Sequence, residues 1–242
     1  MMKPFLLPFL LLAGGSAMAD GTNRAVSSPA DAARQASFDI LAAEVAIDGN
    51  RASFRMALVG AAGSAELQPA GALAGAPVHA YVWPTSLDPA AVGFDAGTGI
   101  LALAATRHPD FDDTPQQDET GDGAADNDGG QWHSHWVVLS PTPACGDGAL
   151  AVRDIPAGET PALPDTWPGL PLFIDSPGMV PQLSDTAITI TLDLPHGADW
   201  SGTAYDGVTA ALRVNADLHA PLLCVTDLFD VASGDLSLPG RM

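Results

Sequence analysis

The chain has 242 residues, and its 29 Asp and Glu against 9 Lys and Arg give a formal net charge of −20. A surface this acidic repels nucleic acid and anionic lipid, so both are excluded as partners, whereas cations are attracted. The length is sufficient for one sizeable β domain or two small ones.

The first 19 residues predict a secretory signal peptide. Lys3 provides a positive start, residues 5–12 form a short apolar run, and Ala17-Met18-Ala19 is a small-residue cleavage site. Cleavage after Ala19 would leave 8 Arg against 29 acidic residues, a net charge of −21. The apolar run is too short to span a membrane, and no later segment is long enough. We therefore expect a periplasmic or secreted protein without a membrane span.

Residues 20–36 are small and polar and are expected to form a loose N-terminal arm. Residues 37–242 contain no internal repeat and no strong linker, so we expect a single domain there. Its first element is a hairpin within 37–59, in which Asp48-Gly49 provides the tight turn between two alternating strands.

Short strands follow along the rest of the chain, separated by turn residues. A long acidic loop covers 107–130, and the proline-rich stretch 155–181 excludes regular helix or central strand over most of its length. The sequence contains no convincing amphipathic helix, so we predict an all-β fold, an antiparallel β-sandwich with a long acidic loop. The further predicted strands are 78–83, 91–94, 100–105, 129–139, 149–154, 186–194, 208–218 and 222–231.

Cys145 and Cys224 are the two cysteines, and each lies at the edge of a predicted apolar strand. Export makes a disulfide between them the expected state. A copper-binding thiol pair is the alternative.

The predicted strand 129–139 contains the motif His133-Ser134-His135. Side chains two apart on a strand point the same way, so the two imidazoles project together and can grip one metal ion. Ser134 points to the opposite face and is not their nucleophile. Both faces of this strand are largely apolar, which predicts a strand covered on both sides. Zinc is the expected ion and copper is the alternative.

Further ligands must come from elsewhere in the chain. His108 stands at the start of the acidic loop, and His79 lies on a strand that can neighbour the His133 strand. Asp110 and Asp112 are the carboxylate candidates. The remaining histidines, His196 and His219, are expected in a turn and on a polar face, outside the site.

The acidic loop also contains a calcium-like pattern. Oxygen-bearing side chains alternate, and Gly123 stands at the sixth position, where a calcium loop turns sharply. The twelfth position is Gly129, so the bidentate acid is missing unless Asp128 replaces it, and no helices flank the loop. The alternatives are a flexible funnel for cations and a disordered segment. The possible calcium ligands are Asp118, Thr120, Asp122, Asp126 and Asp128.

The segment Gln131-Trp132-His133-Ser134-His135-Trp136 resembles the zinc strand of α-carbonic anhydrases, which reads Gln-Phe-His-x-His-Trp. In that family a third His follows about two dozen residues later, but residues 153–160 of this chain contain none. The resemblance implies that this spacing suits zinc, and it does not extend to the activity.

A broader set of segments resembles exported bacterial proteins that are controlled by the zinc-uptake repressor and handle zinc outside the cytoplasm. The segments are residues 81–84, 108–113 and 132–139. This resemblance implies a periplasmic zinc-binding protein.

We therefore expect a periplasmic metal-binding protein that stores zinc or delivers it, for example to a periplasmic metal-transport component. A zinc-dependent hydrolase or lyase is the second hypothesis, because a catalytic zinc needs only an open position and a nearby base. The sequence offers no diagnostic catalytic pair, so whether the protein is an enzyme stays open. A calcium-stabilised extracellular binding domain is the third hypothesis.

Overall fold

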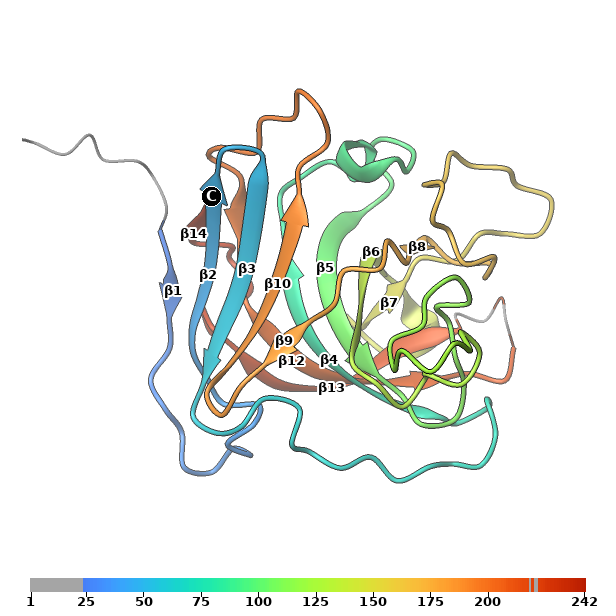
Figure 1. Ribbon diagram of the computed structural model, residues 1–242, viewed down its shortest axis with the longest axis horizontal. Coiled ribbons are helices and arrows are strands. Elements are labelled where there is room, and N and C mark those ends of the chain that lie inside the picture. Colours follow the sequence, from blue (N-terminus) through green and yellow to red (C-terminus); the bar gives the residue numbers. More distant parts are fainter. Residues whose placement is uncertain (1–23, 218, 220–221) are drawn as a thin grey trace, which may run out of the picture.

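The structure is a computed structural model that describes residues 24–217, 219 and 222–242 (Figure 1). It is all-β, and every strand pairing is antiparallel, as predicted. One sheet has five strands in the order β1-β2-β3-β10-β9. Their bounds are β1 (Val26–Ser27), β2 (Ile40–Asp48), β3 (Arg51–Leu58), β10 (Ala187–Asp193) and β9 (Gln182–Leu183).

The second large sheet closes on itself. Its strands follow the order β5-β4-β12-β13-β7-β6-β8, and β5 pairs with β6 as well, so that six of them form a barrel. The prediction of a plain β-sandwich is therefore wrong for this half of the molecule. The bounds are β4 (Pro77–Pro84), β5 (Ile100–Arg107), β6 (His133–Pro141), β7 (Leu150–Val152), β8 (Ile174–Asp175), β12 (Val208–Val214) and β13 (Leu223–Val231).

The five-stranded sheet packs against the outer face of the barrel wall formed by β4, β5 and β6 (Figure 1). Phe54 on β3 meets Trp83 on β4 and Trp136 on β6 edge-on, with ring centroids 6.1 and 5.9 Å apart. These three side chains are buried, and aromatic rings of this size supply much of the apolar area that holds two layers together. A second apolar cluster fills part of the barrel interior.

The strand β6 is covered on both sides, as its two apolar faces predicted. Trp136 and Val138 point into the core shared with the five-stranded sheet, whereas Val137 and Leu139 belong to the cluster inside the barrel. The residues from His133 to Leu139 are all buried. The two histidines of this strand are therefore shielded from bulk solvent.

The hairpin of β2 and β3 forms as predicted, with Gly49 in the left-handed conformation that its tight turn requires. The strand predicted over 91–94 is wrong, because a short 3-10 helix η1 (Pro89–Val92) occupies that position. Asp88 caps it by accepting a hydrogen bond from the Ala90 amide, and Gly93 ends it at a φ of 102°. Local capping overrides the weak apolar pattern here.

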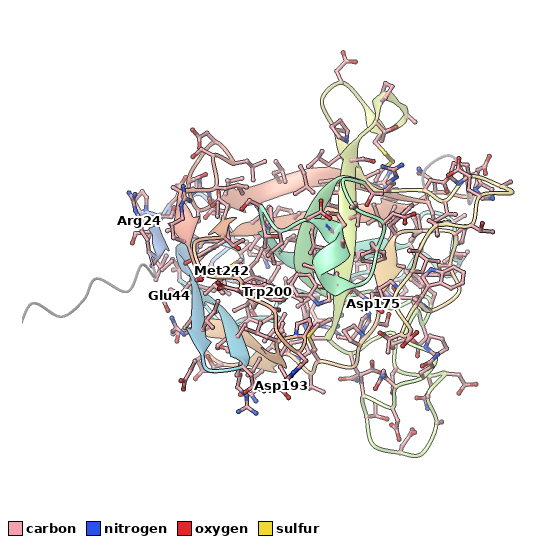
Figure 2. The ribbon with its side chains drawn as sticks, turned by 90° about the horizontal axis from the view of Figure 1, so that it is seen from above. Arg24, Glu44, Asp175, Asp193, Trp200 and Met242 are labelled. Carbon is pink, nitrogen blue, oxygen red and sulfur yellow. A yellow bond between two sulfur atoms is a disulfide. The ribbon has the colours of Figure 1, made fainter. Side chains whose placement is uncertain are left out.

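Two short pieces complete the set of elements: the two-stranded sheet of β11 (Ala204–Tyr205) and β14 (Gly240–Arg241), and the 3-10 helix η2 (Pro143–Cys145). Figure 2 shows that Arg24, Glu44 and Met242 lie well to one side of the molecule from Asp175 on β8.

The N-terminal segment is described only from Arg24 onward. The predicted signal peptide over 1–19 lies outside the described residues. Part of the stretch expected to be a loose arm is bound to the fold, because β1 pairs with β2 and the Arg24 amide donates to the Arg241 carbonyl at 2.9 Å. Within the part of the chain that the structure describes, no helix is long and apolar enough to cross a membrane.

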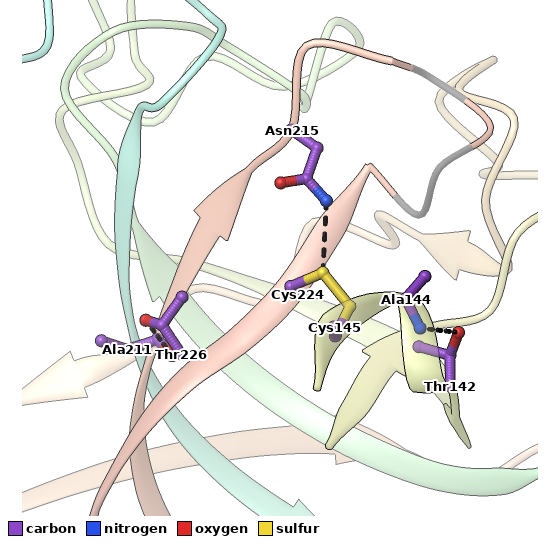
Figure 3. The surroundings of a disulfide bond; sticks show 7 residues. All are labelled: Thr142, Ala144, Cys145, Ala211, Asn215, Cys224 and Thr226. Carbon is purple, nitrogen blue, oxygen red and sulfur yellow. Dashed lines mark hydrogen bonds between the residues drawn. A yellow bond between two sulfur atoms is a disulfide. The ribbon is translucent and has the colours of Figure 1, made fainter. Parts of the chain in front are cut away.

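Cys145 and Cys224 form the predicted disulfide, with Cα atoms 5.5 Å apart (Figure 3). Their sulfurs are bonded to each other, so the alternative of a copper-binding thiol pair is wrong. The bond joins η2 to β13 beside the weakest seam of the barrel, where β13 and β7 share only the pair Cys224 and Ala151. The disulfide thus reinforces the barrel where strand pairing is least extensive.

Candidate metal centre

Four buried side chains converge at one end of the barrel: His108, Asp113, His133 and His135. Each is at most 5% exposed, and one nitrogen or oxygen of each lies within 4.8 Å of the others. This is the only group of three or more His, Cys, Asp or Glu with metal-binding spacing among the residues that the structure describes. The predicted pair on β6 is therefore part of a larger constellation.

Strand register aims the two β6 histidines into the barrel. His133 pairs with Thr106 and His135 pairs with Ala104, both on β5. His108 follows directly after β5, and its amide donates to the Gly129 carbonyl at 3.2 Å, which closes the base of the acidic loop. A Cβ added at Gly129 would lie only 1.7 Å from the Phe111 carbonyl oxygen, so this close approach of the loop's two ends requires glycine.

The Nδ1 atoms of two histidines face backbone carbonyls. His108 Nδ1 lies 2.8 Å from the Phe111 carbonyl oxygen, and His133 Nδ1 lies 3.1 Å from that of Gln131. A carbonyl only accepts hydrogen bonds, so both Nδ1 atoms must carry the hydrogen. In the neutral rings the Nε2 atoms then present lone pairs.

A hydroxyl group fixes the position of the hydrogen on His135 in the same way. Its Nδ1 lies 3.0 Å from Ser176 Oγ, which in turn lies 3.4 Å from the Asp113 backbone carbonyl and donates to it. The hydroxyl therefore accepts from His135 Nδ1. Such outer partners fix the tautomer and the ring orientation of metal-binding histidines.

The inward-facing atoms crowd together. The Nε2 atoms of His108 and His133 are 2.9 Å apart, and they lie 3.0 and 3.1 Å from Asp113 Oδ1. His135 Nε2 lies 3.6 Å from Asp113 Oδ2, is buried, and has no hydrogen-bond partner. A tetrahedron with bonds of about 2.0–2.1 Å has edges of roughly 3.3 Å, so these separations match a zinc ligand set.

Burial and neighbouring charges shift the pKa values of Asp113, His133 and His135. Burial would raise the pKa of Asp113, but the three surrounding histidines hold that pKa well below its ordinary value. Burial also opposes the charged form of His133, yet Asp113, with smaller contributions from Glu119 and Asp112, raises the pKa of His133. Burial lowers the pKa of His135 to about 4, so this ring is neutral at physiological pH and free to act as a ligand.

The structure places the other predicted metal ligands outside the group. His79 shares a β4 face with Tyr81 and Trp83, which point away from the barrel interior, and its ring packs edge-on against Phe38 at 4.9 Å. The β4 residue in the same cross-strand row as His133 is Ala80, because Ala80 pairs with Thr106 and Thr106 pairs with His133. Neighbouring residues on a strand point to opposite faces of the sheet, so His79, one residue before Ala80, points away from the barrel interior.

The two carboxylates predicted as ligands bind backbone amides instead. Asp110 accepts hydrogen bonds from the amides of Ala70 and Gly71 at 2.9 and 2.7 Å. Asp112 accepts from the amides of Thr114 and Asp128 at 2.8 and 3.0 Å. Both acids thus fasten the acidic loop.

The predicted calcium ligands also bind the loop itself. Asp118 accepts from the amides of Gly121, Asp122 and Gly123 at 2.6–3.1 Å, and Asp128 accepts from Glu119 at 2.5 Å. Asp122 accepts from the Ala124 amide and from Asn127, and the hydroxyl of Thr120 lies against Asp118. Asp126 is exposed. These side chains form turn structure, and the described residues of the loop gather no second metal-binding group.

Two residues were not predicted: Asp113, a member of the centre, and Ser176, the hydrogen-bond partner of His135. Asp113 ends the run His108-Pro109-Asp110-Phe111-Asp112-Asp113, and only the folded turn, in which Phe111 stacks on the His108 ring at 3.8 Å, selects it over its acidic neighbours. Ser176 lies 41 residues beyond His135 and carries no sequence signal.

Comparison with known proteins identified no relative of this chain. No protein-family model, curated protein or solved structure matches the chain. The four converging side chains therefore carry the functional argument.

Proposed function

We propose that the protein binds one transition-metal ion, zinc in the first place, through His108, Asp113, His133 and His135, and that it stores or delivers this ion outside the cytoplasm. The observation that carries the proposal is the crowding of three imidazole Nε2 atoms and one carboxylate inside a buried site, where His135 Nε2 has no hydrogen-bond partner. When the rings are neutral, these groups repel one another unless a cation lies between them.

The ligand types favour zinc. Zinc is commonly bound by imidazole nitrogens together with a carboxylate oxygen, and copper(II) is the principal competitor. A complete set of four protein ligands is typical of sites that hold an ion, whereas catalytic zinc usually keeps one position for water. This distinction supports storage or delivery over catalysis.

The proposed location rests on the signal peptide predicted over 1–19. The disulfide between Cys145 and Cys224 is compatible with it, because such bonds persist in oxidising compartments. The recipient of the ion, such as a periplasmic metal-transport component, remains part of the proposal.

The test is metal content, measured by mass spectrometry on untagged protein together with a zinc titration against a chromophoric chelator. We expect about one zinc per chain in the native protein and none in His133→Ala/His135→Ala. The matched control is His196→Ala/His219→Ala, which removes two exposed histidines that are not members of the centre. It should retain the zinc.

Two results would contradict the proposal. One is the absence of zinc or copper in the native protein even after incubation with either ion. The other is equal zinc binding by both double variants, which would place the ion elsewhere on this acidic surface.

A zinc-dependent hydrolase or lyase is the second candidate, and Glu119 favours it. This acid lies beside His133 in the lining of a small cavity of about 40 Å³, and burial raises the pKa of its carboxyl. A cavity of that size holds a water molecule, and a carboxylate there can act as a general base. Ester hydrolysis or hydration by the zinc-loaded protein that is lost in Glu119→Gln would support this candidate.

A further inference from the structure

A large cavity lies inside the barrel and reaches the metal centre. Its volume is about 520 Å³, and its lining includes His135 and Asp113. Small side chains create it, because Ala80 and Ala210 pair across β4 and β12, and Ala104 pairs with His135 across β5 and β6. Protein interiors normally leave few voids larger than a water molecule, and this volume is that of a small-molecule site.

The cavity extends along β6 from the metal centre to an apolar opening. His135, Val137 and Leu139 all line it. The strand advances by four residues from His135 to Leu139, which corresponds to a length of about 13 Å. Ile100, which pairs with Leu139, and Leu228 also line the cavity, and they are 37% and 54% exposed. Exposed side chains of this kind at a cavity mouth are typical of an entrance for apolar ligands.

A strained segment borders the same cavity. Leu236 and Leu238 have φ angles of 58° and 52°, and both side chains contribute to the lining. Bulky residues rarely adopt this left-handed conformation, and such strain clusters at ligand clamps and active sites. Within the described residues, these are the only non-glycine positions with positive φ.

The buried polar atoms of the cavity lining that lack hydrogen-bond partners gather at one end, although Thr85, Thr226 and Asp227 also line the cavity. His135 Nε2 and Thr106 Oγ1 are buried there without hydrogen-bond partners, and His108 and Asp113 are beside them. The cavity is otherwise lined mainly by aliphatic side chains. A ligand that satisfies this environment has one polar end and an apolar body.

We propose that the barrel is a binding chamber for an apolar small molecule with a single oxygen-donor head group, such as an aliphatic carboxylate. The apolar body occupies the space between β6, β4 and β12. The head group meets Thr106 and adds a fifth ligand to the ion held by the four protein side chains, and this last part rests on the proposed metal function. The metal centre would thereby recognise an organic ligand.

The test uses decanoate as the probe, titrated calorimetrically into zinc-loaded and chelator-treated protein. Methyl decanoate, in which the carboxylate is capped, is the matched ligand. We expect decanoate to bind the zinc-loaded protein at least tenfold more tightly than the zinc-free protein, and methyl decanoate to bind both equally. Ala210→Leu, which places a larger side chain in the chamber, should weaken decanoate at least tenfold while keeping one zinc per chain. Ala211→Leu, on the outer face of the same strand, should bind like the native protein.

Each contrary result refers to a separate part of the proposal. Zinc binding without any decanoate binding overturns the chamber and leaves the metal function intact. Decanoate binding that Ala210→Leu does not weaken overturns the location. Decanoate binding that is equal with and without zinc overturns the coordination by the head group. If zinc itself fails to bind, the metal function is lost, and methyl decanoate binding that depends on Ala210 still identifies the chamber.

Discussion

Replacing Asp113 with Asn distinguishes a metal centre from a buried ion pair. The carboxylate lies 3.0 and 3.1 Å from the Nε2 atoms of His108 and His133. If a proton holds the group together, each charged imidazole attracts Asp113 by about 5 kcal/mol at an effective dielectric constant near 20. Loss of such a pair costs about 3–5 kcal/mol of unfolding free energy.

A metal centre predicts a different outcome. In the metal-free protein with neutral rings, the carboxamide introduced by Asp113→Asn can donate its hydrogens to imidazole lone pairs, so this substitution should leave the unfolding free energy unchanged or raise it. Zinc affinity should fall at least 100-fold, about 2.7 kcal/mol, because a charged ligand is lost. The assay combines urea unfolding of the chelator-treated protein at pH 8 with a competitive zinc titration. A loss of about 3 kcal/mol or more in the metal-free protein, with zinc affinity unchanged, would refute the reasoning.

Three further predictions concern the hydrogen-bond partner of His135, the disulfide and the buried Tyr81. Ser176→Ala should lower zinc affinity about 10- to 100-fold in the same titration, because His135 loses the partner that fixes its tautomer. Cys145→Ser/Cys224→Ser should lower the unfolding free energy measured in urea by about 4.5 kcal/mol, since the disulfide closes a loop with a sequence separation of 79. Burial raises the pKa of Tyr81 to about 12, so the folded state keeps a proton that the unfolded chain loses above pH 10. Stability should therefore fall with increasing pH between 10 and 12, by up to about 1.4 kcal/mol per unit, and Tyr81→Phe should remove this contribution.

Local pattern predicts most of the strands in this chain. Residues such as Ile188, Ile190 and Leu192 alternate with polar ones, and the predicted strand 186–194 corresponds closely to β10. The closure of the barrel could not be predicted in this way. It depends on β5 pairing with both β4 and β6, a contact between elements separated by the whole acidic loop.

In the metal centre, too, local features could be predicted from the sequence, whereas contacts between distant segments could not. The spacing of His133 and His135 on one strand is a local property, and it placed both on the same face. The choice between His108 and His79 depended on register across strands, which the sequence does not encode locally. Asp113 depended on the path of a loop whose carboxylates mostly bind its own amides, and nothing in the composition separates it from Asp110 or Asp112.

The position of the four ligands along the chain has a consequence for folding. All of them lie between His108 and His135, the segment that joins the paired strands β5 and β6. Closing a short stretch of chain costs less entropy than assembling distant parts, so this hairpin can gather its ligands before the six strands meet. Zinc present during refolding would then act as an early nucleus and accelerate the appearance of native structure. On the proposed function, the ion would direct the order of assembly in addition to being the cargo of the finished protein.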